Sequence, residues 1–221
     1  MRITALAVLA CAAAASPARA DCPESDVGLR GVQIVTSAPT YDSTYVYFGT
    51  FQAAFDLPAG TLSMYQCCTL LHTWVDTRDA FDVTGVPPGT PVTLTAQLTV
   101  DCFVSTTGCG GSGCSGTVID SLEHGADVDS QVHAVHLFIG REDFHDVLSI
   151  PVTIVAGTPE VIRCKIEGYR NPGGSHDSGG SGSIQFVGLP PGVSVISCQG
   201  YSSQPTPARK RTWGSLKVTY R

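Results

Sequence analysis

Apolar and polar residues alternate strictly along several stretches of this chain, and the longest such stretch runs from Val92 to Val104. Every second position is apolar or a thiol: Val92, Leu94, Ala96, Leu98, Val100, Cys102 and Val104. The positions between them carry Thr93, Thr95, Gln97, Thr99 and Asp101. Successive side chains of a β-strand point to opposite faces, so this pattern predicts a strand with one buried and one solvated face.

Shorter segments repeat the same alternation. They predict strands at residues 43–56, 62–74, 131–139, 147–155, 161–169, 184–187 and 193–197. The first would place Tyr45, Tyr47, Phe51 and Phe55 on one side, and the second Leu62, Met64, Cys68, Leu70 and Trp74. Pro151 lies inside a predicted strand and has no backbone N–H, so that strand is expected at a sheet edge or a bulge. About ten strands with no long helical pattern predict an all-β fold, an antiparallel β-sandwich of jelly-roll or immunoglobulin-like type.

Two turns share one sequence pattern. Gly85-Val86-Pro87-Pro88-Gly89 and Gly188-Leu189-Pro190-Pro191-Gly192 both follow a predicted strand and precede another. Proline fixes the backbone at the first corner of a turn, and glycine accepts the positive φ that the next corner requires. The matching flanks predict equivalent corners of one sandwich. The Gly/Ser-rich segments 105–116 and 171–183 are instead expected to be loops.

The first twenty residues have the features of an export signal. An early Arg2 precedes an apolar run, and Ala18-Arg19-Ala20 is an A-x-A cleavage site, so residues 1–20 are expected to be removed. The alternative is a lipoprotein anchored at Cys11, because Val8-Leu9-Ala10-Cys11 is close to a lipobox. The remaining chain divides into a sandwich domain at 21–201, a Pro-containing basic linker at 202–211 and a short C-terminal element at 212–221.

Eight cysteines remain after cleavage, and an even number in an exported chain predicts disulfides. They are Cys22, Cys67, Cys68, Cys102, Cys109, Cys114, Cys164 and Cys198. The favoured pairs are Cys164 with Cys198 and Cys109 with Cys114, and Cys22 is then expected to bond Cys67, Cys68 or Cys102. The spacing contains no C-x-x-C and does not favour a zinc site.

Charge is distributed unevenly. Residues 21–208 carry 19 acidic and 6 basic residues, whereas 209–221 carry 5 basic residues and no acid. An acidic body disfavours nucleic acid and an anionic membrane as partners. The basic end, with Arg209, Lys210, Arg211 and Trp213, is a candidate for docking on the acidic body, on a second copy of the chain or on an anionic cell-surface polymer, or else a solvated tail. No apolar stretch after the signal is long enough to span a membrane.

The sequence contains no recognisable catalytic motif, so no catalytic residue and no cofactor is predicted. His133 and His136 would lie on opposite faces of one strand and could not hold a common ion, and the other histidines are expected to be isolated and exposed. A structural calcium ion remains an option, with Asp127, Asp129, Glu142, Asp143 and Asp146 as candidate ligands. Trp74, Trp213, Tyr41, Tyr45 and Tyr47 could form a carbohydrate platform, or the tyrosines could simply pack on a neighbouring strand.

The F-x-V-x-G-Φ-P-P-G pattern, together with the closing segment from Gly192 to Tyr201, resembles uncharacterised exported bacterial β-sandwich proteins of the PEP-CTERM style. The Pro-Glu-Pro motif and apolar helix of the PEP-CTERM tail are not present in this sequence. The resemblance implies a fold and an extracellular or periplasmic location, and no reaction. We therefore expect a non-enzymatic surface protein with a structural, adhesive or assembly role. The alternatives are a carbohydrate- or ligand-binding module and, third, a hydrolase with an unrecognised site.

Overall fold

The computed structural model describes residues 22–29, 32–46, 50–67, 72–106, 114–137, 140–170 and 176–203. These residues form thirteen strands and no helix, and all strand pairs are antiparallel. Within these ranges no helix could cross a membrane. The predicted all-β sandwich is therefore confirmed, with more strands than expected.

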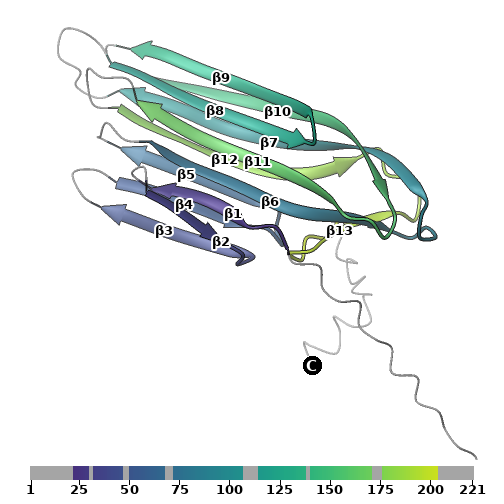
Figure 1. Cartoon of the computed structure of the whole chain (residues 1–221). Coiled ribbons are helices and arrows are strands. Elements are labelled where there is room, and N and C mark those ends of the chain that lie inside the picture. The colour runs from purple at the N-terminus through teal and green to yellow at the C-terminus, as the bar shows by residue number, and fades with distance from the viewer. Residues whose placement is uncertain are drawn as a thin grey trace, which may run out of the picture.

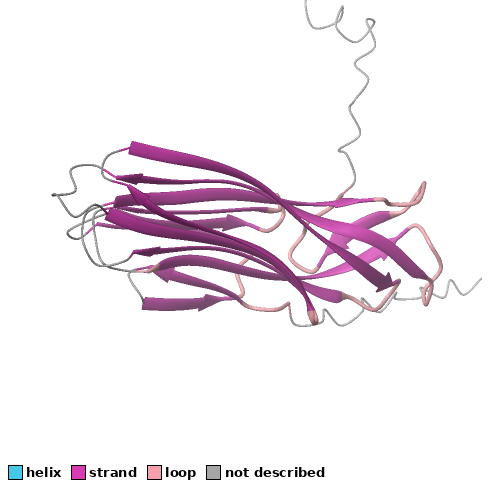
Figure 2. Cartoon of the chain, turned by 90° about the horizontal axis from the view of Figure 1, so that it is seen from above, coloured by secondary structure: helices cyan, strands magenta, loops and turns pink. Residues whose placement is uncertain are grey.

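Two sheets make the two layers of the molecule, and their long strands run side by side without any helix (Figures 1 and 2). The seven-stranded sheet has the order β2-β1-β6-β11-β8-β9, with β13 also paired to β6; the six-stranded sheet has the order β10-β7-β12-β5-β4-β3. The bounds in the first sheet are β1 (Ser25–Leu29), β2 (Val32–Thr36), β6 (Thr73–Thr84), β8 (Cys114–His124), β9 (Asp127–Leu137), β11 (Glu160–Arg170) and β13 (Ser194–Ser197). Those in the second are β3 (Thr40–Val46), β4 (Thr50–Asp56), β5 (Thr61–Cys67), β7 (Pro91–Thr106), β10 (Gly140–Val155) and β12 (His176–Val187).

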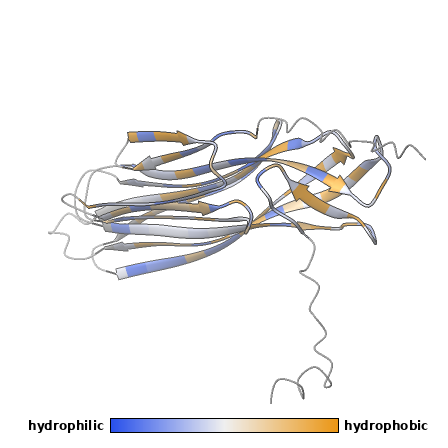
Figure 3. Ribbon diagram, turned by 90° about the horizontal axis from the view of Figure 1, so that it is seen from below, coloured by the Kyte–Doolittle hydropathy of each residue, from blue (hydrophilic) through white to orange (hydrophobic). Residues whose placement is uncertain are grey.

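The core lies between the sheets and is built from alternate residues of each strand. All seven residues of the apolar row predicted between Val92 and Val104 are buried on β7. Hydrophobic residues predominate along the ribbon at the end of the sandwich that contains β13, whereas hydrophobic and hydrophilic residues are mixed toward the opposite end (Figures 1 and 3). Pro151 lies on β10, an edge strand of its sheet, as its missing N–H predicted.

The prediction of a loop at 171–183 is wrong for residues 176–183, which lie inside β12 between β7 and β5. Its inner row includes Gly180 and Gly182, and small residues are needed there. A Cβ on Gly180 would come within 3.2 Å of the Ile166 side chain, and one on Gly182 within 3.3 Å of Ile166 and Leu62. The glycines that make this segment resemble a loop in composition therefore allow β12 to pack closely against the opposite sheet.

Two of the predicted strands are each divided in the structure. Segment 43–56 contains the end of β3 and all of β4, which pair with each other so that Tyr45 faces Phe51. Segment 62–74 contains most of β5, which lies in one sheet, and the first residues of β6, which lies in the other. The apolar and polar residues of the sequence alternate across these connections too, so the pattern does not indicate where the chain changes direction.

The two Pro-Pro-Gly turns are equivalent corners, as predicted. One leads from β6 in the seven-stranded sheet to β7 in the six-stranded sheet, and the other leads from β12 back to β13. Thr90 N–H donates to the Pro87 carbonyl, and Val193 N–H donates to the Pro190 carbonyl in the same way. The glycine at the third position of each turn has positive φ, 83° at Gly89 and 80° at Gly192, which is typical of a type II turn.

The strands β1 and β13 occupy successive parts of one edge of β6, and a disulfide joins them. Strand β1 pairs with residues 74–76 of β6, and β13 pairs with residues 81–84. Cys22 precedes β1, Cys198 follows β13, and the two form a bond with a Cα–Cα distance of 5.6 Å. Cys198 N–H also donates to the Ala80 carbonyl at 2.9 Å. The disulfide therefore holds the first and last described strands on the same neighbour.

The predicted Cys164–Cys198 pair is wrong, as are the partners expected for Cys22. Cys164 is a free thiol in the inner row of β11, and it faces the core, whereas Cys198 lies in the segment that follows β13. Cys102 is also free and buried. The position of Cys102 and Cys164 in apolar rows predicts that both thiols lie in the core, and it does not predict a disulfide.

A non-reducing peptide map tests this connectivity. It should link Cys22 to Cys198 and show that Cys102 and Cys164 react with an alkylating agent only after unfolding. Replacing Cys22 and Cys198 together with serine should lower the free energy of unfolding by about 2–5 kcal/mol, because the bond closes a long loop in the unfolded chain. A peptide that links Cys164 to Cys198 would contradict the structure.

A comparison of two glycines tests the corner between the sheets. Gly85 and Gly89 both have positive φ, 91° and 83°, so alanine should cost about 1–2 kcal/mol at either position. A Cβ on Gly85 would also collide with the carbonyl oxygen of Gly192 in the other turn, whereas one on Gly89 meets nothing within 4 Å. Urea unfolding should therefore show a loss for Gly85→Ala that exceeds the loss for Gly89→Ala by about 1–3 kcal/mol. Equal losses would mean that the two turns are not in contact.

Candidate functional site

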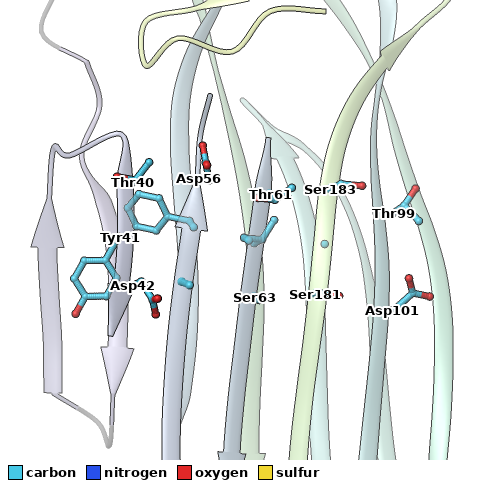
Figure 4. A pocket seen from close by; sticks show the side chains of 14 residues that line it. Thr40, Tyr41, Asp42, Asp56, Thr61, Ser63, Thr99, Asp101, Ser181 and Ser183 are labelled. Carbon is cyan, nitrogen blue, oxygen red and sulfur yellow. The ribbon is translucent and has the colours of Figure 1, made fainter. Parts of the chain in front are cut away.

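A shallow groove of about 650 Å³ crosses the outer face of the six-stranded sheet, over β3, β4, β5, β12 and β7 (Figure 4). Its polar lining consists of hydroxyl groups and carboxylates. These are Thr40, Thr61, Ser63, Thr99, Ser181 and Ser183, then Asp42, Asp56 and Asp101. The groove is therefore rich in short hydrogen-bonding side chains.

Strand register arranges this lining in two rows that run across the strands. Facing residues of neighbouring strands form the first row, Thr40, Asp56, Thr61, Ser183 and Thr99. The second row, two residues further along each strand, is Asp42, Ala54, Ser63, Ser181 and Asp101. With strands about 4.8 Å apart, each row extends for roughly 19 Å. Such rows can contact an extended ligand that lies across the strands.

A third row continues the surface with aromatic rings. Tyr65 on β5 and Phe103 on β7 both face Gly179 of β12, and their ring centroids are 6.3 Å apart. Gly179 is required there, since a Cβ would come within 2.9 Å of the Phe103 ring. The Arg141 guanidinium lies 3.9 Å from the centroid of that ring. Tyr65, Phe103 and Arg141 line a second groove of about 430 Å³, which shares Asp101 and Ser181 with the first.

The first groove is acidic. Its lining contains three carboxylates and neither lysine nor arginine. Asp56 accepts a hydrogen bond from the Ala59 N–H at 3.0 Å, and Asp101 lies 2.7 Å from Nδ1 of His145 on β10. Asp101 remains well exposed, with 73% of its side-chain surface accessible. Neutral groups that both donate and accept hydrogen bonds suit this lining, and anions do not.

A second polar group lies between the sheets, in the inner rows of four strands. Cys102 of β7, Asp120 of β8, His133 of β9 and Asp146 of β10 bring one sulfur, one imidazole and two carboxylates within 4.8 Å of one another. Nε2 of His133 lies 2.5 Å from Oδ2 of Asp146. Asp120 is fully buried and Cys102 is 3% exposed. We call these four residues the inner cluster.

Burial raises the pKa of two residues of the inner cluster, Cys102 and Asp120. The pKa of the Cys102 thiol rises to about 12, with smaller effects from nearby aspartates. Burial, followed by the charge of Asp146, raises the pKa of Asp120 to about 6. Neither carboxylate oxygen of Asp120 has a hydrogen-bond partner among the described residues. A buried carboxyl group without partners destabilises the fold unless something else compensates for its lost hydration.

Sequence reasoning found the members of these sites only in part. The sequence predicts only that His133 shares no ion with His136, whereas in the structure His133 belongs to the inner cluster. A signal was available, because Asp120 and Asp146 stand in rows that are otherwise apolar, between Val118 and Leu122 and between Phe144 and Leu148. The serines of the groove were missed because their segment of β12 was interpreted as a loop. His145 is exposed, as expected, but is paired with Asp101.

The candidate calcium ligands do not form one site among the described residues. Asp129 accepts a hydrogen bond from the Ser149 N–H at 2.8 Å, and Asp143 is bonded to Arg141. Asp146 belongs to the inner cluster. The remaining candidates are Asp127 and Glu142, which lie on β9 and β10.

The aromatic candidates do not form one platform either. Tyr41 packs against the core and stacks on Phe55 with 5.9 Å between centroids, and Tyr45 packs against Phe51 with 6.4 Å between centroids. Trp74 belongs to the other sheet, where it contacts His72 and donates to Asp26 at 2.8 Å. Tyr47 and Trp213 lie outside the described residues.

The remaining predicted cysteines and tail residues are only partly described. Cys67 is bonded in a disulfide, whereas Cys68 and Cys109 lie outside the described residues. Cys114 begins β8, but its side chain is not among those described. The tail residues Arg209, Lys210, Arg211 and Trp213 also lie outside the described part, so tail docking and the Cys109–Cys114 pair stay predictions.

Comparison with known proteins adds no assignment to this geometry. A scan against protein-family models and a search of curated proteins both found no match. The resemblance to exported proteins of the PEP-CTERM style stays a prediction.

Proposed function

We propose that this protein is an exported, non-enzymatic binding protein that holds a neutral, hydroxyl-rich polymer, of the class of glycans, on the outer face of its six-stranded sheet. The observation that carries the proposal is the pair of polar rows that cross five strands. An adhesive role at the cell surface follows from binding of this kind.

The chemistry of the lining supports a sugar polymer over other ligands. Serine and threonine hydroxyls both donate and accept hydrogen bonds, and carboxylates accept strongly from hydroxyl groups. Tyr65 supplies a ring in the third row, beside Phe103, so apolar sugar faces also have a partner. Three carboxylates repel phosphate- or sulfate-bearing polymers.

The stiffness of the platform supports binding without large rearrangement. The rows are on strands rather than loops, and each strand is hydrogen-bonded to its neighbours through the registers above. A preformed surface loses less conformational entropy when a ligand binds. The Cys22–Cys198 disulfide is of a kind that persists in oxidising compartments, which supports export.

Substitutions in the polar and aromatic rows test the proposal. Binding of the untagged protein to an array of neutral and anionic polysaccharides should show neutral ligands only. For a ligand found in this way, Tyr65→Ala and Asp101→Asn should each weaken binding about tenfold, because each removes one contact worth about 1–1.5 kcal/mol. Titration calorimetry measures the change.

Tyr169→Ala is the matched control. Tyr169 is an exposed tyrosine on β11, in the other sheet, so its loss should leave affinity unchanged. Thermal unfolding of each variant separates lost contacts from lost folding, which matters for Tyr65 because its ring packs against Phe103 with 6.3 Å between centroids. Failure to bind any neutral glycan, or equal effects of Tyr169→Ala and Asp101→Asn, would refute the proposal.

A further inference from the structure

We propose that Cys102, Asp120, His133 and Asp146 bind one zinc ion, which cross-links the two sheets along the side where β9 and β10 lie. The proposal stands apart from ligand binding on the outer face, and it rests on the geometry of the inner cluster. Each of the four residues comes from a different strand, two from each sheet.

Asp120 indicates that a cation belongs in this cluster. Its side chain is fully buried, both of its oxygens lack a hydrogen-bond partner among the described residues, and it points toward the other three donors. The nearby imidazole of His133 is already in contact with Asp146 at 2.5 Å. A divalent ion would supply the charge that makes a buried carboxylate stable.

The spacing of the donors fits a four-coordinate site. Zinc bonds of 2.0–2.3 Å place the ligand atoms of a tetrahedron about 3.3–3.8 Å apart. All donor atoms of the cluster already lie within 4.8 Å of one another. Binding of zinc by all four donors therefore requires side-chain movements of about 1 Å. The short His133–Asp146 distance would lengthen, and the longer donor–donor distances would shorten.

The chemical types of the donors select the metal. A thiolate, an imidazole and carboxylates are the ligands that zinc uses in proteins. Calcium requires six to eight oxygens, and magnesium requires oxygen ligands in near-ideal octahedral geometry, so neither suits a set with sulfur and nitrogen. Zinc binding would displace the thiol proton of Cys102, since the thiolate is the ligand.

The surroundings provide both an entrance and a support. His133 and Asp146 retain 17% and 14% of their side-chain surface, so an ion can enter from the β9–β10 side and reach the buried pair. Phe144 stacks on the His133 ring with centroids 4.0 Å apart, which fixes the orientation of the imidazole. Four protein ligands leave no open position, so the ion would be structural rather than catalytic.

Zinc titration of the untagged, oxidised full chain after chelator treatment tests the proposal. Wild-type protein should bind one zinc ion per chain and melt at a higher temperature with zinc than without it. Asp120→Asn and Cys102→Ala should each weaken zinc binding by about 100-fold or more, because each removes a ligand. Calcium at the same concentration should leave the melting temperature unchanged.

Two matched controls isolate the cluster. Cys164→Ala removes another buried free thiol, and His145→Asn breaks an exposed His–Asp pair of similar length, the 2.7 Å contact with Asp101. Both variants should keep wild-type zinc affinity. Zinc binding that survives Asp120→Asn, or that is lost in His145→Asn, would assign the metal to surface histidines and overturn the proposal.

Cobalt spectroscopy decides the question even if a ligand variant fails to fold. Cobalt(II) bound in place of zinc should give the wild-type protein and Cys164→Ala a thiolate-to-metal charge-transfer band and the strong visible absorption of a tetrahedral ion. Absence of the thiolate band from the wild-type protein, or absence of zinc binding altogether, would contradict the site.

Discussion

Close packing of the inner faces of the two sheets is the constraint on which the rest of this structure depends. At β12, Gly180 and Gly182 leave room for Ile166 from the opposite sheet. Because the inner faces exclude water, a polar group in an inner row costs stability unless a partner compensates for its lost hydration. The outer rows of the same strands face solvent, so they can carry polar groups without this cost.

The alternation of one strand therefore separates two kinds of chemistry. On β7, Asp101 points outward into the groove, and the next residue, Cys102, points inward into the cluster. The proposed ligand surface and the proposed metal site thus lie back to back on shared backbone. An ion that holds β7 and β10 against β8 and β9 would also stiffen one end of the outer rows.

Fold class and many strands could be predicted from the sequence because alternation is a local property. Three predictions were correct: the buried row from Val92 to Val104, the edge position of Pro151, and the paired corners at Gly89 and Gly192. The outer polar rows and the inner cluster were harder to predict from the sequence. The outer rows come from five strands whose register depends on sheet order, and the inner cluster joins residues as far apart as 102 and 146.

The errors share a physical cause. Local composition reports what a segment can do in isolation, and it fails where the neighbours impose a different need. Residues 176–183 have the composition of a linker, yet β5 and β7 supply hydrogen bonds on both sides and the opposite sheet favours glycine. Likewise Cys164 and Cys198 both lie near apolar rows. Cys198, which follows β13, lies next to Cys22 at the edge of β6, and Cys164 faces the core from within β11.

The sequence by itself determined that the chain forms an antiparallel sandwich, which side chains of its clearest strands face the core, and where two corners must contain glycine. These follow from side-chain direction and backbone freedom, which are properties of single residues and their neighbours in the chain. Only the tertiary structure decided the strand order, the Cys22–Cys198 bond, the two polar rows and the inner cluster. Each of these requires distant segments to be brought within a few ångströms, and packing of the whole molecule determines which segments meet.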